Sequence, residues 1–216
     1  LAFLITPLIF CVADKLQKPT VHETKLMLVY PRNALALNQS QLIEELVFYI
    51  NSVLRDKFYE KKLTFAPPQL KNPLKDFWGI ISIPGREYLE EAYKERPEIL
   101  ITNTETLKRR LMDPVFQKIV TTLRCCVFDE IHIYEGLHGS NIIFLIRRLK
   151  ALVRKASNKD ILLIGSSATI AEPEQFTKTL FSTDSVKTII PLESELSSSG
   201  KEYHIFLRVG EHFWRF

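Results

Sequence analysis

The sequence predicts an α/β fold in which a mostly parallel sheet carries helices on both faces. Short apolar runs, each long enough for one buried strand, alternate with longer segments whose apolar residues recur every three or four positions. Strand followed by helix occurs four times, and parallel neighbours need crossover helices of this kind. The 216 residues are 46% hydrophobic and 25% charged, which suffices for one sizeable core.

Five segments are expected to be strands because they are short, apolar and bounded by turn residues. They comprise residues 25–30, 78–83, 98–102, 123–128 and 160–165. Helices are expected over residues 1–16, 33–55, 86–96, 102–112, 140–156 and 172–180, with a short helix from residue 113. The clearest helical pattern begins near Ser140, where Ile142, Ile146, Leu149 and Val153 share one face.

Beyond Phe181 the alternation of strand and helix ends. Residues 186–190 have the composition of one further strand, and residues 202–209 alternate as an edge strand after a serine-rich turn. We therefore expect a first domain over residues 1–185 and the start of a linker or next module over residues 186–216.

Composition restricts the classes of partner and compartment. The net charge of +4 permits a nucleic-acid partner without demanding one. Three cysteines without a C-x-x-C pair argue against a zinc knuckle and favour a reduced, cytoplasmic setting. The apolar residues 1–13 are too short for a membrane helix and lack the basic flank of a signal peptide, so we expect no membrane association.

Two carboxylates, Asp129 and Glu130, come directly after the buried strand 123–128. Open α/β sheets bind ligands at the carboxyl ends of their strands. In nucleotide-hydrolysing sheets of this kind, the first carboxylate holds Mg²⁺, usually through water, and the second can polarise the attacking water. Taken alone, such a pair is more often a solvated turn.

A second motif favours a functional site over a solvated turn. The strand at residues 160–165 ends in the small residues 166–169, Ser-Ser-Ala-Thr, about 35 residues after Asp-Glu-Ile-His at 129–132. Strand-Asp-Glu-x-His followed by strand-Ser-Ala-Thr resembles motifs II and III of the DExH-type superfamily-two helicases. The resemblance implies a three-layer RecA-like fold of the P-loop NTPase class, with ATP and Mg²⁺ as cofactors.

The same resemblance implies a role for each residue of these motifs. Asp129 would hold Mg²⁺ through water, and Glu130 would activate the attacking water. Coupling of the ATP state to the nucleic acid would fall to His132, Ser167, Ala168 and Thr169. A histidine that is merely hydrogen-bonded within its loop is the alternative for His132.

Two strand-to-helix junctions resemble the nucleic-acid-contacting motifs Ia and Ib. They are Pro31-Arg32-Asn33 and Thr102-Asn103-Thr104. Helix starts and a cationic side chain can face a phosphate backbone, and such contacts are largely independent of sequence. The alternatives are an ordinary turn at the first junction and a plain capping box of Thr102 and Glu105 at the second.

The pattern Tyr-x-Gly-x-x-Gly-Ser over residues 134–140 resembles the branch of Lhr-like and mitomycin-repair-like DNA helicases, together with motors of phage-defence systems. It implies DNA rather than RNA as substrate and a second RecA-like domain in the same chain. Two departures are Arg32, where motif Ia usually has threonine, and Ile131 within motif II. Neither removes a catalytic group.

A phosphate-binding loop of the form Gly-x-x-x-x-Gly-Lys-Ser/Thr is absent from the 216 residues. Gly200-Lys201 follows a serine run rather than a strand. We therefore expect the loop to precede Leu1 and residues 1–216 to lack ATPase activity by themselves. Two other functions stay open, namely a degenerate motor acting as a nucleic-acid-binding scaffold and an unrelated α/β metal-dependent hydrolase.

Overall fold

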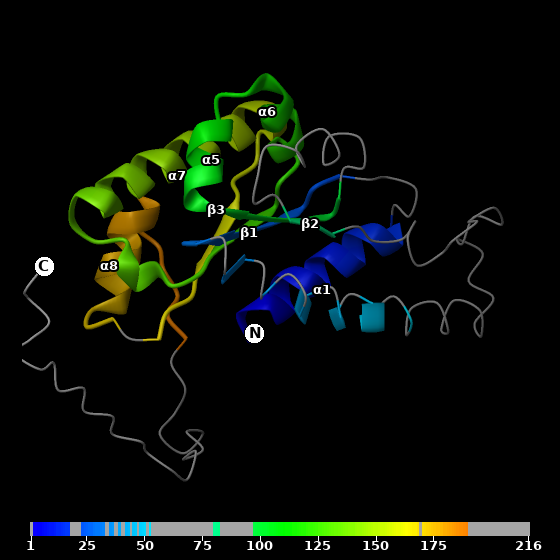
Figure 1. Cartoon of the computed structure of the whole chain (residues 1–216), viewed down its shortest axis with the longest axis horizontal. Helices are drawn as coiled ribbons and strands as arrows, with labels where there is room; N and C mark the ends of the chain where they lie inside the picture. The colour runs from blue at the N-terminus through cyan, green and yellow to red at the C-terminus, as the bar shows by residue number, and fades with distance from the viewer. Residues whose placement is uncertain are drawn as a thin grey trace, which may run out of the picture. The chain divides into compact units, whose positions relative to one another are not determined.

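The computed structural model describes residues 2–17, 23–32, 80–82, 97–168 and 170–189, together with single helical positions between 35 and 52. The chain divides into two compact units, Leu1–Val186 and Lys187–Phe216. All helices and strands of these residues lie in the first unit (Figure 1). The predicted strands at 78–83 and 202–209 and the predicted helix at 86–96 lie wholly or partly outside the described residues.

Five parallel strands form one sheet in the order β2-β3-β1-β4-β5. Their bounds are Leu26–Tyr30 for β1, Ile80–Ser82 for β2, Ile99–Asn103 for β3, Cys125–Phe128 for β4 and Leu162–Gly165 for β5. From β1 the chain proceeds to β2 and β3 on one side, whereas from β4 it proceeds to β5 on the other. The direction in which successive strands are added to the sheet therefore reverses between β1 and β4, and open α/β sheets bind ligands at such a point.

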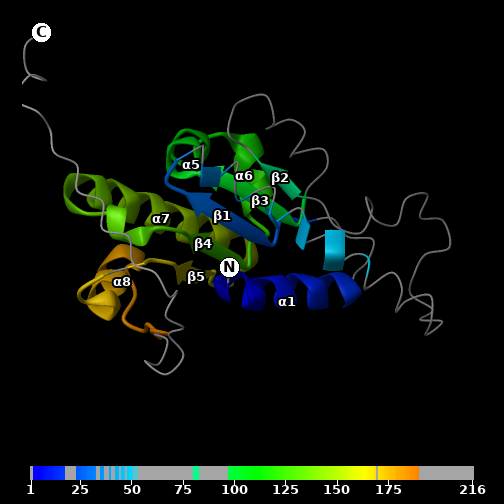
Figure 2. The same ribbon diagram turned by 60° about the horizontal axis from the view of Figure 1, so that its bottom comes forward.

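Helices cover both faces of the sheet, so the three-layer arrangement is confirmed (Figure 2). One face packs against α1, and the other packs against the four later helices. The bounds are Ala2–Gln17 for α1, Thr104–Arg110 for α5, Pro114–Val120 for α6, Gly136–Ser157 for α7 and Pro173–Phe181 for α8. None of the helices in the described ranges is long and apolar enough to cross a membrane.

Strand alternation divides the core between the two faces. Leu26, Leu28 and Tyr30 of β1 pack in the cluster that contains α1, whereas Met27 and Val29 pack in the cluster that contains α7. The alternation follows from the two-residue period of a strand. A strand buried on both faces is apolar throughout, which is why the continuous apolar runs of the sequence predicted this sheet.

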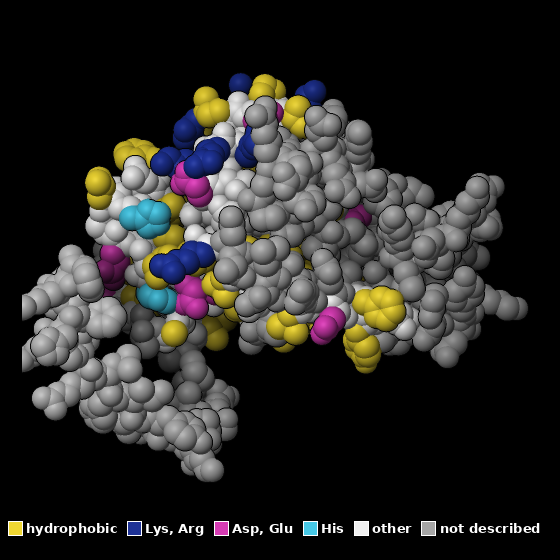
Figure 3. Space-filling view, in the orientation of Figure 1, with side chains coloured by type: hydrophobic (Ala, Val, Ile, Leu, Met, Phe, Trp, Pro, Cys, Tyr) yellow, Lys and Arg dark blue, Asp and Glu magenta, His cyan; other side chains and the backbone are white. Residues whose placement is uncertain are grey.

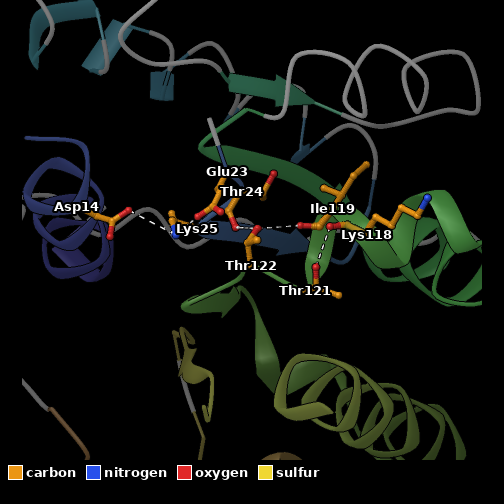
Figure 4. Close-up of polar contacts among 8 residues, drawn as sticks. All are labelled: Asp14, Glu23, Thr24, Lys25, Lys118, Ile119, Thr121 and Thr122. Atoms are coloured by element: carbon orange, nitrogen blue, oxygen red, sulfur yellow. Dashed lines mark hydrogen bonds and ion pairs between the residues drawn. The ribbon is translucent and has the colours of Figure 1, made fainter. Parts of the chain in front are cut away.

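The amino ends of the strands are fixed by polar contacts (Figure 4). The Nζ of Lys25 lies 2.5 Å from Oε2 of Glu23 and 3.5 Å from Oδ2 of Asp14, which ties the end of α1 to the start of β1. The Thr122 hydroxyl donates to the carbonyl oxygen of Thr24 over 3.0 Å. These contacts hold the edge of the sheet opposite residues 129–135, the segment between β4 and α7 that we call the Asp129 loop.

Two helix starts differ from the sequence prediction. The long helix begins at Gly136 rather than near Ser140, because its first turn carries two glycines, a histidine and one exposed leucine, which leave no apolar period to detect. The cap of α5 is Asn103 rather than Thr102, so the predicted capping box is wrong by one residue. Asn103 Oδ1 accepts the Thr106 N–H at 2.7 Å, which satisfies an otherwise unpaired donor of the helix.

The predicted strand at residues 186–190 is not formed over 186–189, the part of it that the structure describes. A strand needs a hydrogen-bonding neighbour, and none of the five strands pairs with this segment. The strand β5 is formed but is less buried than predicted, since Leu162 is 46% exposed. Its position at the edge of the described sheet accounts for that exposure.

Candidate functional site

The Asp129 loop begins where β4 leaves the sheet. The Asp129 N–H donates to the carbonyl oxygen of Val29 at 3.0 Å, which extends the pairing with β1 by one residue. The Glu130 N–H then donates to Oδ1 of Asp129 at 3.0 Å. Glu130 itself adopts a left-handed conformation with φ of 51° and ψ of 45°. Such a conformation is uncommon for a residue with a side chain and is concentrated at functional sites.

The loop after β4 is joined to the loop after β5 by backbone and side chain. The Ile131 N–H donates to the Ser166 carbonyl oxygen at 2.9 Å, and the Ser166 N–H donates to the Phe128 carbonyl oxygen at 2.9 Å. The His132 Nδ1 lies 3.0 Å from the Ser167 hydroxyl oxygen. Predicted motifs II and III are therefore in direct contact.

His132 also contacts the second carboxylate. Its Nδ1 lies 3.2 Å from Oε2 of Glu130, and the two side chains are 36% and 39% exposed. One ring nitrogen thus faces both Glu130 and Ser167, so a hydrogen on it can be directed to either oxygen. Figure 3 shows a histidine and an acidic side chain side by side at the surface of one face. The site is open to solvent and to a ligand.

The other predicted coupling residues are placed less fully. Ala168 is exposed, and Thr169 lies outside the described residues. Their roles stay predictions.

The predicted nucleic-acid residues lie at the ends of neighbouring strands, since Tyr30 pairs with Asn103 at the last position of β1 and β3. Arg32 is exposed and Pro31 is half-buried, whereas Asn33 lies outside the described residues. The backbone carbonyl oxygen of Arg32 accepts the Ala36 N–H at 3.1 Å, as in the first turn of a helix.

The second predicted nucleic-acid junction is more enclosed. Thr102 is 1% exposed, Asn103 4% and Thr104 5%. The Asn103 amide is occupied as the cap of α5. Arg32 is thus the cationic side chain that these two junctions present to solvent, and contact at the second junction would fall chiefly to its backbone.

Two tyrosines beside the Asp129 loop were not among the predicted site residues. The hydroxyls of Tyr30 and Tyr134 are buried and have no hydrogen-bond partner within the described part of the chain. Burial raises the pKa of both phenols above the usual value, and the charge of Asp129 raises the pKa of each further. Sequence could have identified Tyr30 through strand alternation, which places Tyr30 and Asp129 on the same face of the sheet.

Carboxylate oxygens of this loop fit a hard cation. Mg²⁺ is usually held by one or two carboxylates together with water and phosphate oxygens. Asp129 supplies such a carboxylate at the carboxyl end of a buried strand, half-buried and oriented by the Glu130 N–H. Among the described residues, no group of three or more histidine, cysteine, aspartate or glutamate side chains could hold a metal. The arrangement suits a phosphate-borne cation better than an all-protein metal cage.

Comparison with known proteins decides the family. The model of the DEAD/DEAH box helicase family matches residues 4–176. This chain belongs to that family. The predicted contact between motifs II and III is therefore a feature of a helicase domain, and the alternative of an unrelated metal-dependent hydrolase is excluded.

Individual helicases of known sequence support the predicted branch. An uncharacterized ATP-dependent helicase of Methanocaldococcus jannaschii is 26% identical over 164 residues, which cover 75% of this chain and 21% of that protein. The ATP-dependent helicase Lhr-Core of Methanothermobacter thermautotrophicus is 35% identical over 88 residues, which cover 40% of this chain and 10% of that protein. The resemblance to the Lhr-like branch is confirmed. The chain spans about a fifth of the length of the first relative.

A solved structure supports the fold. The helicase Lhr of Mycobacterium smegmatis, bound to single-stranded DNA and AMP-PNP, superposes with a TM-score of 0.56 at 22% identity. The match covers 73% of this chain and 18% of that one. The predicted RecA-like fold is thereby confirmed.

Proposed function

We propose that this helicase-family domain is the first motor domain of an ATP-dependent helicase or translocase that acts on DNA rather than RNA. The observation that carries the proposal is the contact of His132 with both Glu130 and Ser167, next to Asp129. It joins the two loops that end β4 and β5, so a change at the carboxylates can reach the second loop. DNA is favoured because the chain resembles the Lhr-like branch in sequence, and the solved Lhr of that branch holds single-stranded DNA.

The residues of the Asp129 loop divide the chemistry of ATP hydrolysis between them. Asp129 would hold Mg²⁺ through water, and the cation would neutralise charge on the transferred phosphate. Glu130 would orient the attacking water and accept its proton. His132 holds the Glu130 carboxylate at 3.2 Å from its Nδ1, which limits the positions that this carboxylate can take.

Coupling would pass from His132 to Ser167, with Ala168 and Thr169 continuing the second loop. The nucleic-acid backbone would lie against the junctions at residues 31–33 and 102–104. Arg32 is exposed there and would meet a phosphate. Neutralising phosphates with cationic side chains gives affinity that falls with salt and depends little on base sequence.

We propose that residues 1–185 form part of the ATP-binding domain and that residues 186–216 begin a linker or the next module. The phosphate-binding loop and a second RecA-like domain would belong to the same longer polypeptide, and residues 1–216 by themselves would not hydrolyse ATP. We also propose a cytoplasmic location, in keeping with three cysteines that are all free thiols.

The test is ATP hydrolysis by the full-length protein with and without single-stranded DNA or RNA. We expect hydrolysis that requires Mg²⁺ and that single-stranded DNA stimulates more than RNA does. Asp129→Asn should lower the rate by about 100-fold or more, because the amide removes the charge that attracts the cation. If the wild-type protein binds nucleic acid but does not hydrolyse ATP, the motor function is wrong and the nucleic-acid-binding scaffold is favoured.

A further inference from the structure

Tyr30 is placed beside Asp129 by the register of the sheet. Val29 pairs with Phe128, and the Asp129 N–H donates to the Val29 carbonyl oxygen at 3.0 Å, so the next residues along are neighbours across the two strands. Tyr30 packs on the α1 face of the sheet. Strand alternation places Asp129 on that same face, because Cys125 and Val127 of β4 also pack there.

The Tyr30 hydroxyl is set up as a hydrogen-bond donor without an acceptor. Tyr30 is 1% exposed, and its hydroxyl has no partner in the described ranges of the chain. A buried hydroxyl without a partner is destabilising, and phenylalanine would fill the same space without that cost. A phenol hydroxyl carries one hydrogen that it can donate, and this hydrogen is available for an acceptor.

Tyr134 provides an internal comparison. Its hydroxyl is also buried and without a partner among the described residues, and Tyr134 is 2% exposed. Its ring, however, packs on the opposite face, in the cluster that contains α7, with its centroid 5.7 Å from that of His138. Removing either hydroxyl is the same chemical change in an equally buried place. The charge of Asp129 raises the pKa of both phenols, but of the two tyrosines Tyr30 is the one on the sheet face of Asp129.

We propose that Tyr30 is a positioning residue whose hydroxyl donates, through one bound water, to the Asp129 carboxylate when the site is loaded. A buried water of this kind is stable when it has two or more polar partners, and the phenol and the carboxylate provide two. The Glu130 N–H already donates to Oδ1 of Asp129. Fixed at both ends, the carboxylate would keep the orientation in which it attracts the cation. This inference rests on the proposed role of Asp129.

The experiment measures how equilibrium binding of a fluorescent, non-hydrolysable ATP analogue by the full-length protein depends on Mg²⁺. We expect Tyr30→Phe to raise the half-saturating Mg²⁺ concentration by about three- to tenfold, the size of one ordinary hydrogen bond, because a water separates the phenol from the charged carboxylate. Tyr134→Phe should change it by less than about twofold. Urea unfolding of both variants reports stability separately, and Tyr30→Phe should match or exceed the wild type.

An unchanged Mg²⁺ dependence of Tyr30→Phe would overturn the inference, and so would an equal shift in both tyrosine variants, which would indicate a general effect of removing a buried hydroxyl. Asp129→Asn separates this inference from the proposed function. If Asp129→Asn abolishes Mg²⁺-dependent binding while Tyr30→Phe behaves as wild type, only the role of Tyr30 fails. If Asp129→Asn binds as wild type, the proposed role of Asp129 fails.

Discussion

The Nδ1 of His132 lies 3.0 Å from the hydroxyl oxygen of Ser167, which is 35 residues further along the chain. The contact spans two neighbouring strand ends, because β4 and β5 are paired in the sheet. It is the side-chain link between the loop that carries both carboxylates and the loop that ends β5. A signal that depends on the state of the carboxylates can use this link.

If that link couples nucleotide to nucleic acid, His132→Ala and Ser167→Ala should each reduce DNA stimulation of ATP hydrolysis in the full-length protein, by about tenfold. The double variant should be no worse than either single variant, because both remove the same contact. Ser166→Ala is the control, since Ser166 joins the loops through its backbone. Additive losses in the double variant would contradict a shared coupling path.

The two glycines that begin α7 should differ in their tolerance of alanine. A Cβ on Gly139 would lie 2.3 Å from the backbone oxygen of Tyr134, which cannot move without shifting the helix start. A Cβ on Gly136 meets nothing within 4 Å, although its φ of +56° is unfavourable for alanine. We expect Gly139→Ala to lower the free energy of unfolding by about 2–3 kcal/mol and Gly136→Ala by about 1 kcal/mol. Urea unfolding measures both losses. A larger loss for Gly136→Ala than for Gly139→Ala would contradict the close approach of Gly139 to the Tyr134 backbone.

Removal of the Lys25 ammonium should lower the free energy of unfolding by a moderate amount. The Lys25 side chain is only 8% exposed and pairs with Asp14 and Glu23, but these carboxylates are 40% and 33% exposed and are partly screened by water. We expect Lys25→Met, which keeps the apolar stem, to lower the free energy of unfolding by about 1 kcal/mol. Lys178→Met, which breaks the helical pair with Glu174, should cost less than about 0.5 kcal/mol. Equal losses of unfolding free energy in the two variants would show that burial of Lys25 does not strengthen its ion pairs.

The three cysteines should be unreactive in the native protein. Burial raises the pKa of Cys11 and of Cys125 from 9.0 to about 12, with the nearby Cys125 adding to the shift at Cys11. Burial likewise raises the pKa of Cys126. At about pH 8 a thiol reagent should label none of them until denaturant is added, since the thiolate is the reactive form. Rapid labelling of the native protein would contradict this packing.

The same shifts predict a loss of stability at high pH. A thiol whose pKa is higher in the folded state stabilises that state fully below the unfolded value of 9.0, and the contribution declines as pH rises toward about 12. The free energy of unfolding should therefore fall as pH rises above 9.0. The raised pKa values of Tyr30 and Tyr134 act in the same direction. Cys125→Ala should make the decline shallower, and an unchanged slope would contradict the assignment.

The sheet could be predicted from sequence because its central strands are buried on both faces and therefore read as continuous apolar runs. The same property identified the strand end that carries Asp129 and Glu130. The cap of α5 was harder to place, because Thr102 with Glu105 and Asn103 with Thr106 are both plausible capping pairs. Side-chain geometry decides between them, and Asn103 accepts the Thr106 N–H.

Two other features depended on distances that no pattern in the sequence records. The start of α7 at Gly136 depends on the close approach of Gly139 to the Tyr134 backbone, which no apolar period records. The position of the Tyr30 hydroxyl, which has no partner among the described residues, depends on strand register, since its neighbour Asp129 follows a different strand. Sequence motifs identify the residues of the site more readily than the residues that support them.

The central claim is that Glu130 activates water for ATP hydrolysis, and Glu130→Gln in the full-length protein tests it most directly. The amide keeps the size of the side chain but cannot accept the proton of the attacking water. We expect DNA-stimulated hydrolysis to fall by about 100-fold or more, while binding of the ATP analogue stays within about threefold of the wild type. Glu135→Gln, on an exposed residue of the same loop that caps no backbone group with its side chain, should hydrolyse ATP at close to the wild-type rate. Hydrolysis by Glu130→Gln at the wild-type rate would contradict the account.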